Sequence, residues 1–268
     1  MFKILFIGDI IGKIGRAGVR NLLPKLKKSL KIDLVIANVE NLAHGKGVTE
    51  RTLNEIKEAG VDIFTSGNHI WKKRTEAEEI FKKQDFFLLR PANYPTGVLG
   101  VGEKIFITEN KEKILVINLI GRVFFKEDFD CPFRAIDKIL KKYKKEKLNA
   151  IVIDFHAEAT SETRALGFYV DGRISAIFGT HSHVPTADAK ILSNGTAYIT
   201  DAGMVGAENS VIGVEKESVI QSYLTQINHQ FVFPEKGECV FNSVLTEIDL
   251  KTGKAVNIKR IDRKTMIG

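Results

Sequence analysis

The feature that most constrains the fold is the alternation of short apolar runs with amphipathic stretches in the first 65 residues. An amphipathic stretch over residues 16–30 indicates one helix, and Thr49 suits the N-cap of a second that runs to Gly60. Three apolar runs have the length and β-branched content of buried strands: residues 4–7, 33–38 and 61–65. Because strands that alternate with helices pair in parallel beneath them, this region predicts a βαβαβ unit.

The rest of the chain carries more strand-like runs and fewer helical ones. Short turns join the predicted strands 86–89, 105–108 and 113–119, which is typical of hairpins. Helices are predicted over residues 133–147 and, with weaker marking, 215–227. Further strands are expected at residues 150–155, 174–178, 190–192, 197–200, 241–248 and 256–261. No linker or internal repeat divides the chain, so we expect one α/β domain over residues 1–268, with two packed β-sheets flanked by helices.

Composition and charge exclude several classes of protein. With 44% hydrophobic and 27% charged residues the chain is neither disordered nor a coiled coil. No apolar run approaches the ~18 residues of a membrane span, and the apolar start lacks a signal-peptide cleavage site. Cys131 and Cys239 form no CxxC pair, which favours a reducing, cytoplasmic location. The net charge of +7 would help an anionic ligand approach, but Lys-rich residues 141–145 are typical of a solvated helix face rather than an RNA-binding module.

Polar side chains follow five of the predicted strands at their carboxyl ends, where ligands gather in parallel sheets. These groups are Gly8-Asp9, residues 38–41, Gly67-Asn68-His69, residues 154–158 and residues 179–183. Four of the six histidines fall here: His69, His156, His181 and His183. A single histidine at such a place is more often structural than a ligand. Four of them beside carboxylates and amides predict a metal site, and this nitrogen and oxygen donor set suits Fe, Mn, Zn or Co.

The glycines after the first predicted strand do not form a recognisable nucleotide-binding loop. Residues 8–18 contain no GxGxxG pattern. The stretch that begins at Gly8 is also one residue too short for a phosphate-binding loop of the GxxxxGK[ST] type, and Ile14 stands where a hydroxyl should bind magnesium. The tight turn more simply lets the backbone pass close to the predicted metal site.

In their order along the chain, these residues resemble the calcineurin-like metallophosphoesterases, and within them the YmdB-like bacterial phosphodiesterases. The superfamily places a histidine two residues after the first Asp and an Asp at the bridging position, where this chain has Ile11 and Glu40. Both departures are shared with the YmdB-like branch. The resemblance runs from Met1 to about Glu215 and is carried by Asn38-Val39-Glu40-Asn41, residues 154–162, residues 179–188 and residues 200–204.

The resemblance implies a four-layer α/β/β/α sandwich that holds two metal ions. Iron is favoured, with manganese or another divalent ion as the alternative. Glu40 would bridge the ions and His69 would serve as the general acid. One ion would be held by Asp9, Glu40, Asn41 and His183, and the other by Glu40, Asn68, His156 and His181.

The resemblance also implies an activity: a phosphodiesterase that opens 2′,3′-cyclic nucleotides such as 2′,3′-cAMP to the 3′-monophosphate. A hydroxide that bridges the ions would attack phosphorus, and His69 would protonate the departing ribose oxygen. Two alternatives stay open. The same chemistry suits a broader phosphomonoesterase or nuclease, and a regulatory scaffold could act through protein or RNA contacts. Since this family tends to form homo-oligomers, we expect further copies of the chain as partners, and no membrane.

Five polar residues near the motifs have open roles. Asn41 is either a metal ligand or a hydrogen-bonding neighbour of one. Glu158 and Glu162 either orient ligand imidazoles or serve as surface and helix-capping residues. His44, in the glycine-rich residues 43–47, is a candidate substrate contact. His229 matches no motif and is expected to be structural or exposed.

Overall fold

The N-terminal βαβαβ unit forms one half of a five-stranded sheet in the structure, a computed structural model that describes residues 1–268. The sheet has the order β14-β13-β1-β3-β4, with β1, β3 and β4 parallel and β13 antiparallel to β1. Its strands are β1 (Phe2–Ile7), β3 (Leu34–Asn38), β4 (Ile63–Thr65), β13 (Ser243–Asp249) and β14 (Lys254–Arg260). The helices on its outer face are α1 (Gly12–Leu30), α2 (Glu50–Glu58) and α3 (Arg74–Lys83).

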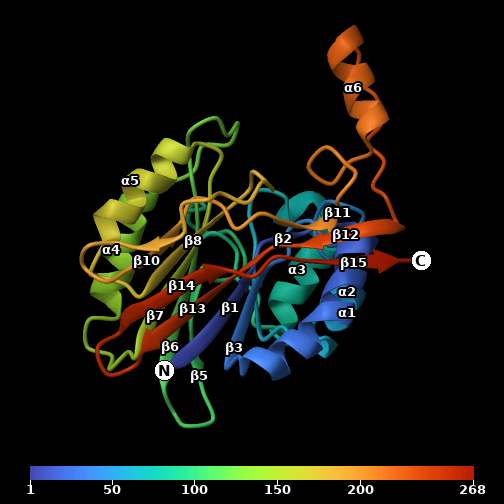
Figure 1. Ribbon diagram of the computed structural model, residues 1–268. Coiled ribbons are helices and arrows are strands. Elements are labelled where there is room, and N and C mark those ends of the chain that lie inside the picture. Colours follow the sequence, from blue (N-terminus) through green and yellow to red (C-terminus); the bar gives the residue numbers. More distant parts are fainter.

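The second large sheet has six strands in the order β5-β6-β7-β8-β10-β9. The four inner strands β6, β7, β8 and β10 are parallel, and the two edge strands are antiparallel to their neighbours. The strands are β5 (Glu103–Ile107), β6 (Lys113–Ile120), β7 (Ala150–His156), β8 (Ala176–Thr180), β9 (Lys190–Ile191) and β10 (Ala197–Ile199). Helices α4 (Pro132–Lys142) and α5 (Thr160–Val170) cover its outer face (Figure 1).

The two large sheets pack face to face, which confirms the predicted pair of sheets flanked by helices. A cluster of 19 buried residues fills the space between them, and the rings of Phe6 and Phe178 stack there at 4.6 Å. A cluster of 29 residues joins the first sheet to its helices, and one of 14 joins the second sheet to α4 and α5. These apolar contacts between layers provide the main driving force for the fold.

A third, four-stranded sheet was not anticipated from the sequence. It has the order β15-β12-β11-β2, and its strands are β2 (Asp9–Ile10), β11 (Met204–Ala207), β12 (Gly237–Phe241) and β15 (Arg263–Ile267). The single strand predicted over 241–248 is therefore two strands in two sheets, divided at Asn242. Asn242 lies between the two sheets, because its carbonyl accepts from the Gly8 N–H at 3.4 Å and its own N–H donates to the Met204 carbonyl at 3.2 Å.

Several predicted element bounds were wrong. Helix α1 begins at Gly12 rather than at residue 16, and α4 ends at Lys142 rather than at 147. Helices α3 and α5 and the 3₁₀ helix η1 (Ile70–Lys73) were not predicted. Residues 86–89 form only an isolated bridge from Leu88 to Phe64. The missed helices carry few buried apolar residues, so their sequence periodicity is weak.

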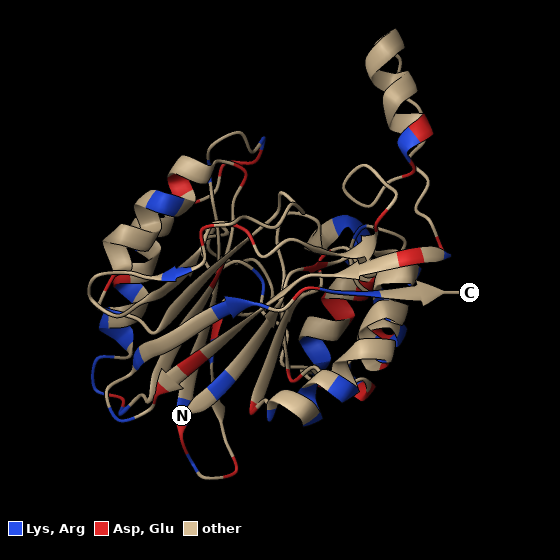
Figure 2. Cartoon of the chain, in the orientation of Figure 1, with Lys and Arg blue, Asp and Glu red and all other residues tan.

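Helix α6 (Lys216–Thr225) was predicted and stands away from the rest of the molecule (Figure 1). Val219 is its one buried residue. Apart from Lys216 and Glu217 at its start, the helix carries no charged side chain (Figure 2). In this structure no helix combines the length and the apolar character that a membrane span requires.

Candidate metal centre

The polar residues predicted at strand ends meet at the seam between the two large sheets. Asp9 lies in β2, directly after β1, and Glu40 and Asn68 follow β3 and β4 of the first sheet. His156 ends β7 and His181 follows β8, both in the second sheet. Parallel pairing places these carboxyl ends at one edge, so residues far apart in sequence become neighbours.

Glu40 is the most connected carboxylate of this group and is only 1% exposed. Its Oε1 lies 3.3 Å from His156 Nε2 and 3.2 Å from His69 Nδ1, and its Oε2 accepts a 2.8 Å hydrogen bond from the His69 backbone N–H. Burial alone would raise its pKa, but the charges and hydrogen bonds of His156 and His69 outweigh burial and hold the pKa of Glu40 well below its usual value. Glu40 is therefore an ionised carboxylate at the centre of the cluster.

His156 and His181 bring two ring nitrogens together beside Glu40. The distance from His156 Nε2 to His181 Nδ1 is 2.9 Å, and Asn68 Oδ1 lies 3.2 Å from the same His156 nitrogen. One ligand atom from each of Glu40, His156 and His181 lies within 4.8 Å of the other two, a spacing that suits chelation of a metal ion.

The pKa values of these two histidines move in opposite directions. Burial would lower the pKa of His156, but the Glu40 charge opposes burial and raises the pKa to about 9. Burial, followed by the charge of His156, lowers the pKa of His181 to about 3. The His181 imidazole is thus neutral, the form that binds a cation, and an ion bound at His156 would displace its proton.

Asp9 provides the clearest indication that these residues suit a cation. Its side chain is completely buried, and its Oδ2 accepts a 3.1 Å hydrogen bond from the His181 backbone N–H. Its Oδ1 is also buried and has no hydrogen-bond partner. Because a buried carboxylate oxygen without a partner is costly, this atom fits the chemistry of a metal ligand. His183 Nε2 lies 3.9 Å from the same oxygen, on the side where a shared cation could sit.

Asn41 and His69 lie between Glu40 and the outside. The Asn41 amide nitrogen lies 3.3 Å from His183 Nε2 and 3.3 Å from Glu40 Oε1, while its oxygen lies 2.9 Å from His69 Nδ1. Asn41 thus contacts residues proposed for both sides of the site, which suits either of its predicted roles. The His69 side chain is 24% exposed and, with Nδ1 engaged, its Nε2 is available to a ligand.

A buried hydrogen-bond network orients His156. Its Nδ1 lies 2.9 Å from Thr180 Oγ1, and the Thr180 hydroxyl donates to Asp154 Oδ1 at 2.7 Å. Asp154 also accepts hydrogen bonds from Thr65 and Asn38. Burial raises the pKa of Asp154 to about 7 although these hydrogen bonds oppose the rise. Because Thr180 gives its proton to Asp154, its oxygen accepts from His156 Nδ1–H and leaves Nε2 to face the site.

The loop after β8 holds its two histidines in uncommon backbone conformations. His181 has a φ of 112° and His183 a φ of 64°, both in the region that favours glycine. Asp201 fixes this loop by accepting from the Ser182 N–H at 2.8 Å and the Gly203 N–H at 2.7 Å. Gly67 permits a second close approach, since a Cβ there would lie 2.3 Å from the His156 ring and 2.4 Å from Glu40 Oε2.

Other partners of the histidines were only partly foreseen. Glu158 Oε2 lies 2.6 Å from His181 Nε2, as one of its two predicted roles requires, and His183 Nδ1 donates to the Ile212 carbonyl at 2.8 Å. Glu162 contacts no histidine and accepts from the backbone N–H groups of Arg122 and Val123. Sequence reasoning missed Asp154, Thr180, Asp201 and Ile212 as supporting residues, because their roles depend on which strands are neighbours.

Two further histidines lie apart from this network of contacts. His44, a predicted substrate contact, lines a hollow of about 1040 Å³ with Lys13, Arg16 and Arg51 rather than joining the cluster. His229 is exposed, and its backbone N–H donates to Ser222 Oγ. The structure thus brings seven predicted ligands and His69 together, and leaves His44 outside that group.

Comparisons with known proteins show which family the chain resembles. The model of the family described as "YmdB-like protein" matches residues 5–261. A 2′,3′-cyclic-nucleotide 2′-phosphodiesterase of Bacillus subtilis (strain 168) is 45% identical over 261 residues, which cover 97% of this chain and 96% of that protein. A solved structure of a hypothetical protein from Thermus thermophilus is 38% identical with a TM-score of 0.90, covering 98% of this chain and 99% of the other. A novel phosphatase from Mycoplasma pneumoniae is 37% identical with a TM-score of 0.91, covering 99% and 94%.

Proposed function

Since the chain belongs to the YmdB-like protein family and is a phosphodiesterase or phosphatase of the metallophosphoesterase type, we propose that it hydrolyses 2′,3′-cyclic nucleotides with two bound metal ions. The observation that carries the proposal is the buried cluster of Glu40, His156 and His181 beside the unpartnered Asp9 oxygen. The activity named for the Bacillus subtilis relative supports the choice of substrate.

The donor set fits two cations that share Glu40. Iron is the favoured metal and manganese the alternative, because imidazole, carboxylate and amide donors suit both. When bound, the ions would neutralise phosphate charge and make water a stronger nucleophile. Asp9, Glu40, Asn41 and His183 would hold one ion, and Glu40, Asn68, His156 and His181 the other.

His69 is the proposed general acid. Its Nδ1 lies beside two acceptors, Asn41 Oδ1 and the Glu40 carboxylate, so Nδ1 keeps a proton. The Nε2 atom is then the one that can deliver a second proton to the substrate. Opening the ring to a 3′-monophosphate releases the ribose 2′-oxygen, which needs that proton as it leaves phosphorus.

A metal-loaded preparation tests the proposal. Protein purified anaerobically and reloaded with iron or manganese should convert 2′,3′-cAMP to 3′-AMP, and Asp9→Asn should lose both metal and activity. A panel of p-nitrophenyl phosphate, bis-p-nitrophenyl phosphate, 2′,3′-cAMP and RNA compares the substrate classes. Faster turnover of the monoester or of RNA would favour the broader phosphatase or nuclease. Full activity after the metal has been removed would refute the mechanism.

We also propose that helix α6 mediates homo-oligomer formation. Tyr223 and Leu224 on the helix are 75% and 72% exposed, and Ile227 just beyond its end is 66% exposed. The helix is nearly free of charge beyond its first turn. A second copy of the same apolar helix is a complementary partner for such a surface. Sedimentation of wild type and of Tyr223→Ser/Leu224→Ser tests this, since the double variant should shift toward monomer.

A cytoplasmic location, favoured by the two free cysteines, stays a prediction.

A further inference from the structure

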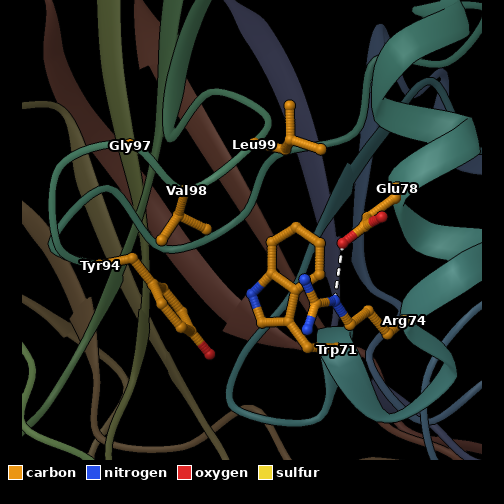
Figure 3. A pocket seen from close by; sticks show the side chains of 7 residues that line it. All are labelled: Trp71, Arg74, Glu78, Tyr94, Gly97, Val98 and Leu99. Atoms are coloured by element: carbon orange, nitrogen blue, oxygen red, sulfur yellow. Dashed lines mark hydrogen bonds and ion pairs between the residues drawn. The ribbon is translucent and has the colours of Figure 1, made fainter.

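We propose that the pocket between Trp71 and Tyr94 binds the nucleobase of the substrate and so makes these two residues specificity determinants. The inference rests on the proposed cyclic-nucleotide activity. The pocket has a volume of about 450 Å³, within the range of small-molecule sites. Trp71, Tyr94, Val98 and Leu99 form apolar walls, and the ion pair of Arg74 with Glu78, at 2.7 Å, borders them (Figure 3).

One short segment carries both a wall of the pocket and the proposed general acid. Trp71 belongs to the 3₁₀ helix η1, whose N-cap is His69, so the indole and the His69 imidazole are anchored two residues apart. In a nucleoside 2′,3′-cyclic phosphate a single ribose separates the base from the phosphorus. A site for the base must therefore lie next to the site for the phosphate, and the place of Trp71 in η1 directly after His69 supports this pocket as that site.

Aromatic side chains line the way from the pocket to the metal centre. Tyr94 packs against Phe129 with ring centroids 4.9 Å apart, and Phe129 packs against Phe125 at 5.8 Å. Phe125 in turn lies 5.0 Å from the His181 ring. Burial raises the pKa of the Tyr94 hydroxyl and the Glu40 carboxylate raises it further, which agrees with their proximity. A series of packed rings thus connects Tyr94 of the pocket with His181 of the metal centre.

The chemistry of the walls matches a purine or pyrimidine. The rings of Trp71 and Tyr94 are 6.5 Å apart at an interplanar angle of 79°, and a base could stack on either exposed face. The Trp71 indole nitrogen is buried and has no hydrogen-bond partner, and it lies on the ring edge that faces Tyr94 (Figure 3). A ring nitrogen or carbonyl oxygen of a base can accept from this N–H.

Trp71 provides a direct measurement of binding because it is the single tryptophan of the chain. The metal-loaded protein is titrated with 3′-AMP while indole fluorescence is recorded, with inorganic phosphate as the base-free control. We expect a saturable change with 3′-AMP and none with phosphate. Inhibition of hydrolysis by 3′-AMP without any change in fluorescence would place the base elsewhere and overturn the inference.

Kinetics separate base recognition from catalysis. Trp71→Ala should lower kcat/KM for 2′,3′-cAMP about 5- to 150-fold, mainly through KM, which corresponds to the ~1–3 kcal/mol of one stacked base. Its kcat/KM for a base-free ribose 2,3-cyclic phosphate should stay within about twofold of wild type. Phe168→Ala, which removes an exposed aromatic ring on α5, is the matched control and should leave kcat/KM for both substrates unchanged.

Trp71 also packs on Phe81 at 5.4 Å, so folding needs its own check. Tyr94→Ala and Trp71→Phe, each compared with wild type by thermal melting, provide variants for this purpose. If well-folded Trp71 and Tyr94 variants lose kcat/KM equally for both substrates, the base site is refuted. If wild type hydrolyses no cyclic nucleotide, the proposed function fails, and the fluorescence titration alone then decides whether the pocket binds a nucleotide.

Discussion

His69 is held by Asn41 and Glu40 at the outer edge of the cluster, and this position supports a test at the scale of one residue. His69→Ala should lower kcat for 2′,3′-cAMP about 10²- to 10⁴-fold, because the leaving oxygen loses its proton donor. Metal content, measured by elemental analysis, should be unchanged. His229→Ala, at an exposed position outside the site, is the control. Hydrolysis at the wild-type rate in His69→Ala would exclude the general-acid role.

Cys239 supports a prediction on pH dependence. The thiol is completely buried, and burial raises its pKa to about 12. Since the folded pKa lies above the ordinary value of 9.0, the stabilisation from the neutral thiol is complete below about pH 9 and is lost as pH rises toward about 12. At about pH 8, iodoacetamide should label only Cys131 in the native protein and both cysteines after unfolding. Mass spectrometry that finds native Cys239 alkylated would contradict this.

At the scale of elements, Glu162 links helix α5 to the segment that carries Phe125. Its carboxylate accepts from the Arg122 and Val123 N–H groups at 2.9–3.1 Å. Glu162→Ala removes the charged acceptor of these part-buried hydrogen bonds and should destabilise the protein by about 1.5–3 kcal/mol. Thermal unfolding should show a Tm lower by several degrees, and Glu162→Gln should recover part of the loss. A Tm that does not change would mean that water replaces the carboxylate.

The strand and helix alternation of residues 1–65 was predictable, because buried strands need continuous apolar runs and the helices that cover them need one apolar face. The same logic predicted which polar residues come together, since parallel pairing places Glu40 and Asn68 at one edge of the first sheet and His156 and His181 at one edge of the second. The division at Asn242 was not predictable, because the residues on both sides of it have the pattern of one strand and the hydrogen bonds of Asn242 go to the remote residues Gly8 and Met204. The Thr180–Asp154 network also required the pairing of β7 with β8, which no local pattern encodes.

At the scale of the whole molecule, the proposed ions would join the two large sheets. Glu40 follows β3 of the first sheet, His156 and His181 lie at β7 and β8 of the second, and Asp9 lies in β2 of the third, so binding would stabilise the packing of these sheets. Adding manganese at about 100 times its Kd to chelator-treated protein should contribute about 2.7 kcal/mol and raise Tm by about 5–10 °C. Calorimetry on Asp9→Asn should show little of this rise. An equal rise in that variant would mean that the metal acts elsewhere.

The pairing of β1 with β13 has a consequence for synthesis on the ribosome. Phe2 lies opposite Ile248, so β1 stays open on one edge until β13 (Ser243–Asp249) has been translated. An unpaired apolar edge on a nascent chain is prone to aggregate. Chaperone dependence should therefore be greatest before β13 has been made, and truncation ahead of residue 243 should yield insoluble product even though the proposed ligands have all been made.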